Sequence, residues 1–547
     1  MTATEGIRLR PGTVERSVGW GPTLVVGLAV GALFATTVTG FEARVTDIAA
    51  RRILEGQVPY RDFWSMYAPG SYTVLAAAFA VFGRQLIVSN ILGSLTALAS
   101  VLAYHRVVLR VAPPRIAGLS AVLVAIAFWS ASYSDGFTSY PAASLLIWCA
   151  VICLANYARG GSRPMLVSIG LCLGGAAVFK HDIAGYASIA TAFALLAIPG
   201  QPWATRLRAV AAVAAIVVAI VAAALWVLWR AGAGSDLMRD LVVFPLTDFK
   251  YVRPEYFPLF PQLRESAFET IRELIYWSKC NLPLYALLAG LVLVWKSRRQ
   301  LPPERLVIFG FAAAAYPLFW TAAHVQLNTH IVTITALGAA VGAGACAVLG
   351  LERVRRLAVL AVGVAAGWGA VLAAEDGARF AISVSKGREW VGLPRLRGIA
   401  VPPANAEWMR ALASALQRAD DPAAPLLMLS NRNDVVVYAE GVPYWLSDRR
   451  IVTRHHELHP GITDTAPIQR QMLDDVEAGL LPVIVREHRF TDEILERVKA
   501  DFLRHVKVGS SLLDDWVAQT YVKGEFFGDY ELLRRRDRTP SLDSRRD

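Results

Sequence analysis

Stretches of roughly 20 mostly apolar residues recur along the first two thirds of the chain, and they constrain its fold more than any other feature. A helix needs about 20 such residues to span a bilayer, and a spanning segment must satisfy its backbone hydrogen bonds internally. The stretches fall at approximately residues 18–40, 86–108, 115–133, 137–157, 164–180, 183–199, 206–231, 279–295, 305–323, 327–349 and 357–374. Hydrophobic residues make up 55% of the 547 residues, too many for a soluble chain of this length. We therefore expect a polytopic all-α membrane domain over residues 18–375, with about 11 spans.

The basic residues predict how this domain is oriented. The formal net charge is +11, and the charges gather in alternate connections between spans instead of on one soluble face, which argues against a nucleic-acid partner. These residues are Arg106, Arg110, Arg115, Arg159, Arg163, Arg206, Arg208, Lys296, Arg298, Arg299, Arg305, Arg353, Arg355 and Arg356. The positive-inside rule makes those connections and the tail 1–17 cytoplasmic, provided that segment 71–83 lies in the interface and does not cross. We expect a multi-pass membrane protein with outer loops 41–70 and 232–278.

A second domain is expected over residues 376–547, where the hydropathy falls. Two stretches have helical periodicity (Ala406–Ala419 and Pro467–Gly479), and three short apolar runs resemble buried strands (Leu426–Ser430, Val435–Tyr438 and Leu481–Arg486). Helices that alternate with apolar strands indicate an extracytoplasmic α/β domain with a mainly parallel sheet. Within this domain, the run from Arg454 to His459 lacks the helical spacing of a zinc motif and adjoins Pro460-Gly461, so we expect a loop without a metal. No other pattern predicts a cofactor.

Four short motifs in the expected outer connections contain ionisable residues, which are costly at membrane helix ends and therefore functional candidates. The first outer loop contains Glu42, Asp47, Arg61 and Asp62, and the segment Tyr133–Tyr140 contains Asp135. The stretch Gly174–Asp182 contains Lys180 and His181, and Ala323–His330 contains His324. In this order the motifs resemble the GT-C glycosyltransferase superfamily, especially bacterial relatives of protein O-mannosyltransferases and of the aminoarabinose transferase acting on lipid A.

The resemblance implies a protein of the bacterial cytoplasmic (inner) membrane that transfers a sugar from a lipid-linked donor. Glu42 matches the second member of the acidic pair that opens the family's first outer loop, whereas Phe41 stands where the family usually has Asp. Glu42, Asp47 and Asp62 are therefore considered together as the base. Asp135 matches a further acid that faces the same cavity in the family. Lys180 matches a lysine near the lipid phosphate.

Such a reaction needs a base for the acceptor hydroxyl and positive charge for the departing phosphate. One of the first-loop acids would be the base, while Lys180, with Arg61, His181 or His324, would neutralise the phosphate. The expected partners are a polyprenyl-phosphate-sugar donor, membrane lipid, and a glycan, lipid or protein acceptor. Neither a metal nor a cofactor is expected.

Each assignment also has a purely structural alternative. The charges of residues 42–55 fit the solvated face of an interfacial helix with ion pairs four residues apart. Asp62 is able to fix a turn with Arg61, Asp135 to cap a helix, and Lys180 to pair with Asp182. For the whole protein, the alternative function is a transporter or flippase of a lipid-linked sugar.

Overall fold

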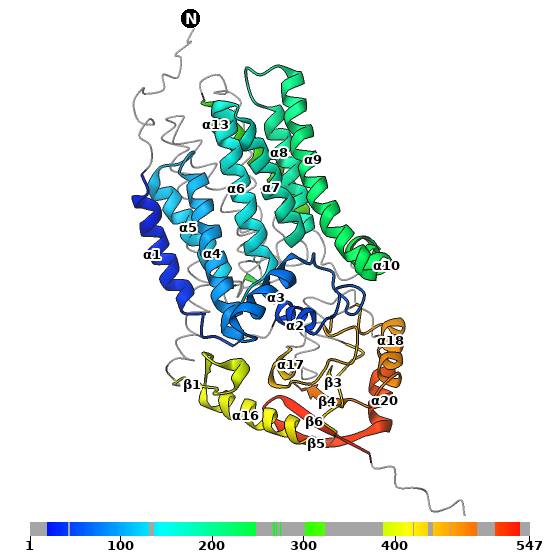
Figure 1. The fold of residues 1–547 in the computed structure, drawn as a ribbon. Coiled ribbons are helices and arrows are strands. Elements are labelled where there is room, and N and C mark those ends of the chain that lie inside the picture. Colours follow the sequence, from blue (N-terminus) through cyan, green and yellow to red (C-terminus); the bar gives the residue numbers. More distant parts are fainter. Residues whose placement is uncertain are drawn as a thin grey trace, which may run out of the picture.

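The computed structural model describes residues 19–41, 44–130, 136–247, 266, 267, 270, 274, 301–322, 385, 387–419, 421–435, 441–459, 461–488 and 509–536. A bundle of long helices occupies one end of the molecule, and a smaller region of helices and strands occupies the other (Figure 1). The bundle comprises α1 (Gly21–Ala35), α4 (Leu86–Val108), α5 (Pro114–Ser130), α6 (Ser139–Gly160), α7 (Arg163–Phe179), α8 (His181–Leu196), α9 (Trp203–Leu228) and α13 (Pro303–Ala322). Beyond α9 the helix continues through η1 (Trp229–Ala233), α10 (Gly234–Met238), η2 (Arg239–Val243) and α11 (Phe244–Thr247).

Every predicted hydrophobic span that lies in the described residues forms a helix. Three of these are by themselves long and apolar enough to cross a membrane, namely 86–108, 139–160 and 203–247. Shorter apolar helices accompany them over 21–35, 70–82, 114–126 and 163–179. The predicted spans 279–295, 327–349 and 357–374 lie outside the described residues, so the number of crossings stays a prediction.

Small residues allow the bundle helices to approach closely. A Cβ atom added at Gly170 or Gly174 of α7 would lie 2.7 Å from a side-chain atom of Ile216 or Ile220 of α9, respectively. Only glycine leaves room for these isoleucines. This is the packing that membrane helices use, because van der Waals contact between close backbones has to stabilise their association in lipid.

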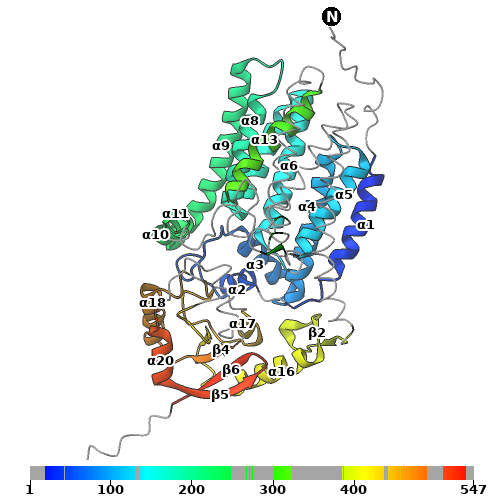
Figure 2. The same cartoon turned by 180° about the vertical axis from the view of Figure 1, so that it is seen from behind.

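Two of the arginines that were predicted on one side, Arg106 and Arg159, lie in the last turns of α4 and α6, whose ends are at the bundle end farthest from the strands (Figure 2). The Arg106 guanidinium lies 4.4 Å from the ring centroid of Trp20, just before α1. Arg159, at the end of α6, forms a 3.2 Å ion pair with Glu304, at the start of α13. Arg110, just after α4, donates to the Asn156 side chain of α6 at 2.9 Å. The ends of α4 and α6 and the beginnings of α1 and α13 therefore share one end of the bundle.

The C-terminal region contains a four-stranded mixed sheet in the order β3-β4-β6-β5. The described helices and strands of the whole C-terminal region are β1 (Glu389–Trp390), η4 (Pro394–Leu396), β2 (Ala400–Val401), α16 (Pro403–Arg418), β3 (Leu426–Ser430), α17 (Val442–Leu446), α18 (Ala466–Glu477), β4 (Val483–Glu487), α20 (Leu512–Thr520), β5 (Tyr521–Phe527) and β6 (Tyr530–Arg535). The predicted helices 406–419 and 467–479 correspond to α16 and α18, and the predicted strands 426–430 and 481–486 to β3 and β4. The predicted strand 435–438 lies outside the described residues except for Val435.

The prediction of a mainly parallel sheet is wrong. Strands β3 and β4 are parallel, but β4 pairs antiparallel with β6, and β6 pairs antiparallel with β5. The last two strands form a hairpin that turns at Gly528, where φ is 58°. A two-residue turn can only join antiparallel strands.

One hydrophobic core joins the C-terminal sheet to the helical bundle. Two short helices, α2 (Val45–Leu54) and α3 (Gly70–Phe82), lie between the two regions (Figure 1). Leu75 and Phe79 of α3 are buried in the same cluster as Leu426 and Val485 of the sheet, and the Phe79 ring packs edge-on against Trp445 at 5.7 Å. On the other face of the sheet, α18 and α20 contribute to a separate core. The C-terminal region thus packs against the outer-loop helices as part of the same folded unit.

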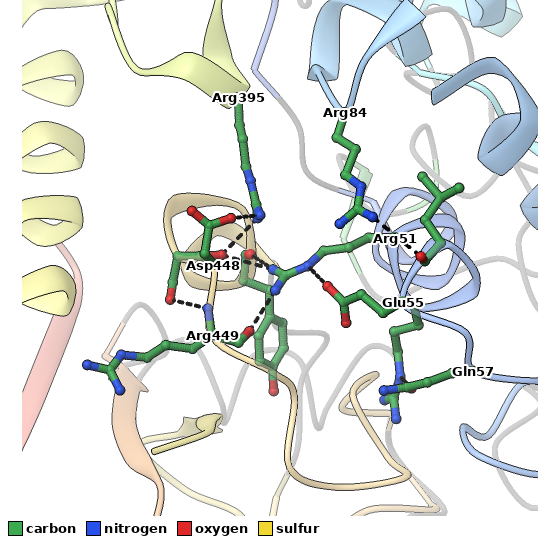
Figure 3. A network of polar contacts seen from close by, with 11 residues as sticks. Arg51, Glu55, Gln57, Arg84, Arg395, Asp448 and Arg449 are labelled. Atoms are coloured by element: carbon green, nitrogen blue, oxygen red, sulfur yellow. Dashed lines mark hydrogen bonds and ion pairs between the residues drawn. The ribbon is translucent and has the colours of Figure 1, made fainter. Parts of the chain in front are cut away.

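Buried arginines reinforce this junction (Figure 3). The Arg51 guanidinium, on α2, donates to the carbonyl oxygens of Tyr444, Ser447 (3.0 Å) and Arg449 (2.6 Å). It also pairs with Glu55 at 2.6 Å. The Arg51 side chain is only 2% exposed, so it does not lie on a solvated face of α2. Of the structural alternative for residues 42–55, Arg51 therefore fits only the ion pair with the residue four positions away.

Candidate active site

Three of the four predicted motifs meet at the bundle end that faces the C-terminal sheet. A Cβ atom added at Gly70, the first residue of α3, would lie 2.7 Å from the Val178 carbonyl oxygen at the end of α7. The rings of Phe137 and Phe179 pack edge-on at 6.2 Å. The first outer loop, the beginning of α6 and the junction of α7 with α8 are therefore adjacent.

Lys180 is the central cation of this cluster. It lies at the break between α7 and α8, in an extended conformation. Its Nζ atom is 4.8 Å from the ring centroid of Tyr67, 5.1 Å from that of Tyr140, and 3.4 Å from a carboxylate oxygen of Asp182. The side chain is only 10% exposed. The two aromatic faces stabilise the cation without neutralising it, and Asp182 is its anionic partner in the structure.

Arg61 and Asp62 form a turn, which is the structural role that the sequence offered for Asp62 as an alternative to acting as the base. Two guanidinium nitrogens of Arg61 donate to Asp62 at 2.7 and 2.8 Å, and a third donates to the Ala231 carbonyl oxygen at 2.8 Å. The Asp62 carboxylate also accepts the Val58 N–H. Hydrogen bonds from Arg61, and then from Val58, hold the pKa of Asp62 below its usual value, which makes its carboxylate a weaker base.

Asp47 is fully buried at the start of α2, where its carboxylate accepts the Arg44 N–H at 2.9 Å. A carboxylate in the first turn satisfies a backbone donor that the helix leaves open, and it interacts favourably with the helix dipole. Asp47 therefore stabilises the start of α2.

Three other predicted residues, Glu42, Asp135 and His324, lie outside the described residues. Their described neighbours are informative for the first two. A Cβ atom added at Gly136 would lie 3.1 Å from Cδ of Arg44. Gly136, the residue after Asp135, thus lies against Arg44, which is two positions after Glu42. His181, the remaining predicted residue, begins α8 beside Lys180, and its Nδ1 has no hydrogen-bond partner among the described residues.

A loop of the C-terminal region, residues 453–459, completes this end of the molecule, and sequence reasoning did not assign it to the site. It is a loop, as predicted, but it is buried against the first outer loop. The Trp64 N–H donates to the Arg454 carbonyl oxygen at 3.0 Å, and the rings of Phe63 and His456 pack edge-on at 5.6 Å. Among the described residues, no group of His, Cys, Asp and Glu is arranged to hold a metal.

Arg52 links α2 to this loop. Its guanidinium donates to the Thr453 carbonyl oxygen at 2.9 Å, contacts His456 Nδ1 at 3.3 Å, and also donates to the Asp62 carbonyl oxygen at 2.9 Å. It lies 5.1 Å from the ring centroid of Phe63. The only sequence signal for this role was the pair of adjacent arginines in α2, which does not identify a partner 401 positions away.

Glu457 is a buried acid within this loop, 6% exposed. Its Oε2 has no hydrogen-bond partner among the described residues, and its carboxylate interacts electrostatically with the Tyr72 hydroxyl. Burial raises the pKa of Glu457 from 4.5 to about 7. Because water does not solvate the charged form, the folded protein favours the neutral acid.

Glu457→Gln is therefore expected to change how stability depends on pH. The folded pKa lies above the unfolded value, so the contribution of neutral Glu457 is complete below about pH 4.5 and is lost as the pH rises towards 7. The thermal midpoint of the wild-type protein should fall relative to that of the glutamine variant between pH 5 and 8. His455 and His456 titrate in both proteins, so the difference isolates Glu457. Midpoint curves that stay parallel would contradict a buried, neutral Glu457.

Comparisons with known proteins identify the fold. No protein-family model and no curated protein matches the sequence. Two similar solved structures are those of ArnT from Cupriavidus metallidurans, one bound to undecaprenyl phosphate and one in the apo state. The first matches with a TM-score of 0.51 and 13% identity over 95% of this chain and 98% of ArnT. The second matches with a TM-score of 0.51 and 12% identity over 93% and 96%, respectively. The chain therefore has the fold of the GT-C membrane glycosyltransferases, as its motifs predicted.

Proposed function

We propose that this protein transfers a sugar from a polyprenyl-phosphate-linked donor to a glycan, lipid or protein acceptor of the cell envelope. The observation that carries the proposal is the buried Lys180 ammonium, seated on Tyr67 and Tyr140 where three outer motifs meet. A structure that shares the fold, that of ArnT, was solved with undecaprenyl phosphate. A buried lysine ammonium can form charge-assisted hydrogen bonds to a lipid phosphate.

The proposed location is the outer face of the bacterial cytoplasmic membrane. The apolar helices favour a multi-pass protein, and the arginines at the bundle end opposite Lys180 favour a cytoplasmic position for that end. In this proposal the tail 1–17 is cytoplasmic, residues 18–375 form the membrane domain of about 11 spans, and residues 376–547 form an outer α/β domain. The acceptor would then approach from outside the cell.

In the proposed reaction, an acceptor hydroxyl attacks the anomeric carbon and loses its proton to a carboxylate. The bond between that carbon and the phosphate oxygen breaks, and its electron pair stays on the phosphate, whose negative charge Lys180 stabilises. We propose Glu42 as the base and Asp135 as a supporting acid. Asp47 and Asp62 would instead hold the shape of the first loop, since both already accept backbone hydrogen bonds. His181, Arg61 and His324 remain proposed neighbours of the phosphate, and the reaction as written draws on no metal or cofactor.

Lys180→Met tests the phosphate site. Losing one charge-assisted contact costs about 1.5 to 3 kcal/mol, so the dissociation constant for undecaprenyl phosphate should rise by roughly 10- to 150-fold. Binding to the purified protein in detergent is the measurement. Arg159→Met, which removes an ion-paired cation at the opposite end of the bundle, should leave the affinity unchanged. Unchanged affinity in Lys180→Met, with reduced stability, would instead assign the lysine to its pair with Asp182.

A further inference from the structure

Tyr60 has an unusual backbone conformation beside the proposed phosphate site. Among the described residues it is the one non-glycine residue with a positive φ, 69°. This left-handed conformation is unfavourable for a residue with a Cβ atom, and it persists only where surrounding contacts enforce it. Tyr60 is fully buried, and its N–H donates to the Phe63 carbonyl oxygen at 2.8 Å. The contacts on either side of Tyr60 therefore indicate what the strain achieves.

On one side, Arg454 of the C-terminal region holds Tyr60 in place. Its guanidinium donates through Nη2 to the Tyr60 carbonyl oxygen and, at 3.0 Å, to the Asp240 carboxylate. Nη1 lies 3.3 Å from the carboxylate of Asp236. The Arg454 side chain is 9% exposed and Asp240 1% exposed. Water cannot readily replace such bonds, so Arg454 fixes the Tyr60 turn against the helical segment that extends α9.

On the other side, Tyr60 supports the residue that seats Lys180. The Tyr60 hydroxyl donates to the Tyr67 carbonyl oxygen at 2.6 Å. The Tyr67 ring, in turn, lies 4.8 Å from Lys180 Nζ. A continuous set of contacts thus leads from Arg454 through the strained turn to the proposed phosphate-binding ammonium.

We propose that Arg454 is a positioning residue for the phosphate site: it holds Tyr60 in its left-handed conformation, so that the Tyr60 hydroxyl orients Tyr67 beneath Lys180. The inference rests on the proposed function. Without Arg454, the turn loses a bond that offsets its strain, and relaxation of the turn would withdraw the hydroxyl from Tyr67. The C-terminal region thereby acts on donor binding without touching the donor.

A double-mutant cycle on undecaprenyl phosphate affinity tests this inference. Arg454→Met and Tyr60→Phe should each weaken binding about tenfold, because each interrupts the same path. The double variant should also be weaker by about tenfold, and not by the roughly hundredfold that independent effects would give. Arg454→Lys keeps a cation beside Asp240 but loses the planar fork, so it should recover stability more fully than affinity.

Arg449→Met is the matched control. The Arg449 guanidinium is also buried, but it donates to the carbonyl oxygens of Leu416, Ala419 and Ala424 within the C-terminal region. Its loss should reduce stability without weakening undecaprenyl phosphate binding. Equal losses of affinity in Arg449→Met and Arg454→Met, or multiplicative effects in the cycle, would overturn the positioning role. If Arg454→Met does not fold, unchanged affinity in Tyr60→Phe overturns it as well. Unchanged affinity in Lys180→Met would instead contradict the proposed phosphate site, on which this inference rests.

Discussion

Replacing Glu42 with glutamine is expected to abolish sugar transfer while undecaprenyl phosphate binding persists. Glutamine keeps the size and hydrogen-bonding capacity of the side chain but lacks the basic oxygen. Loss of a general base typically lowers the rate by about 10²- to 10⁴-fold. Glu42 follows the first span directly in the sequence, and Asp47 and Asp62 are already bound to backbone donors. The measurement is transfer by the purified variant, with donor-lipid affinity measured in parallel.

Asp47→Asn and Asp62→Asn are the matched controls for Glu42→Gln. Each should lower stability modestly, because an amide replaces a carboxylate that accepts a backbone hydrogen bond, but transfer should continue. If Glu42→Gln stays active and one of the asparagine variants is inactive, the base is that aspartate. Transfer by all three variants would contradict the assignment of the base to the acids of the first outer loop.

Arg51→Met is expected to destabilise the junction between α2 and the C-terminal region. The substitution leaves the carbonyl oxygens of Tyr444 and Arg449 without this buried donor, whereas that of Ser447 keeps a 2.8 Å hydrogen bond from Arg395. Each unsatisfied group costs about 1 to 3 kcal/mol, so a total loss of roughly 3 to 5 kcal/mol is expected. For a unit of 150 to 250 residues, this corresponds to a fall in the thermal midpoint of about 6 to 20 °C.

Arg84→Met is the control for Arg51→Met, because both arginines lie at the same junction (Figure 3). Arg84 is exposed and donates to one carbonyl oxygen, that of Leu54, at 3.4 Å. Its loss should change the free energy of unfolding by no more than about 0.5 kcal/mol. The thermal midpoint should therefore stay close to that of the wild-type protein. Similar shifts for the two variants would show that the buried bonds of Arg51 do not stabilise the junction.

The helices could be predicted from the sequence because hydropathy is a local property. A run such as 86–108 is predominantly apolar, and α4 has those bounds. The sheet was harder to predict. Strands β3 and β4 are buried runs between helices and resemble a parallel unit, whereas the β5–β6 hairpin follows only at Tyr521 and contains charged residues on its exposed face. The order and direction of strand pairing depend on contacts between distant segments, which local periodicity does not contain.

The same distinction applies to the site. Arg61 and Asp62 are neighbours in the sequence, so their turn could be anticipated, and so could the pair of Lys180 and Asp182. The contacts of Arg454 with Tyr60 and Asp240 join residues 394 and 214 positions apart. No spacing rule connects such residues, and a charged loop beside Pro460 looks solvent-exposed when only its composition is considered. It is buried because Phe63 and Trp64 of the first outer loop pack against its histidines.

The central claim is that this protein breaks the bond between a sugar and a polyprenyl phosphate. The most direct test uses purified protein in detergent, where there is no bilayer to cross, incubated with the lipid fraction and envelope acceptors from a strain that lacks the protein. Mass spectrometry should show the lipid-linked sugar disappearing while polyprenyl phosphate and a glycosylated acceptor appear, with no conversion by Glu42→Gln. The claim would be contradicted if the lipid-linked sugar stays intact after incubation with folded wild-type protein. If the envelope of the strain that lacks the protein also lacks that sugar, this result would indicate a flippase.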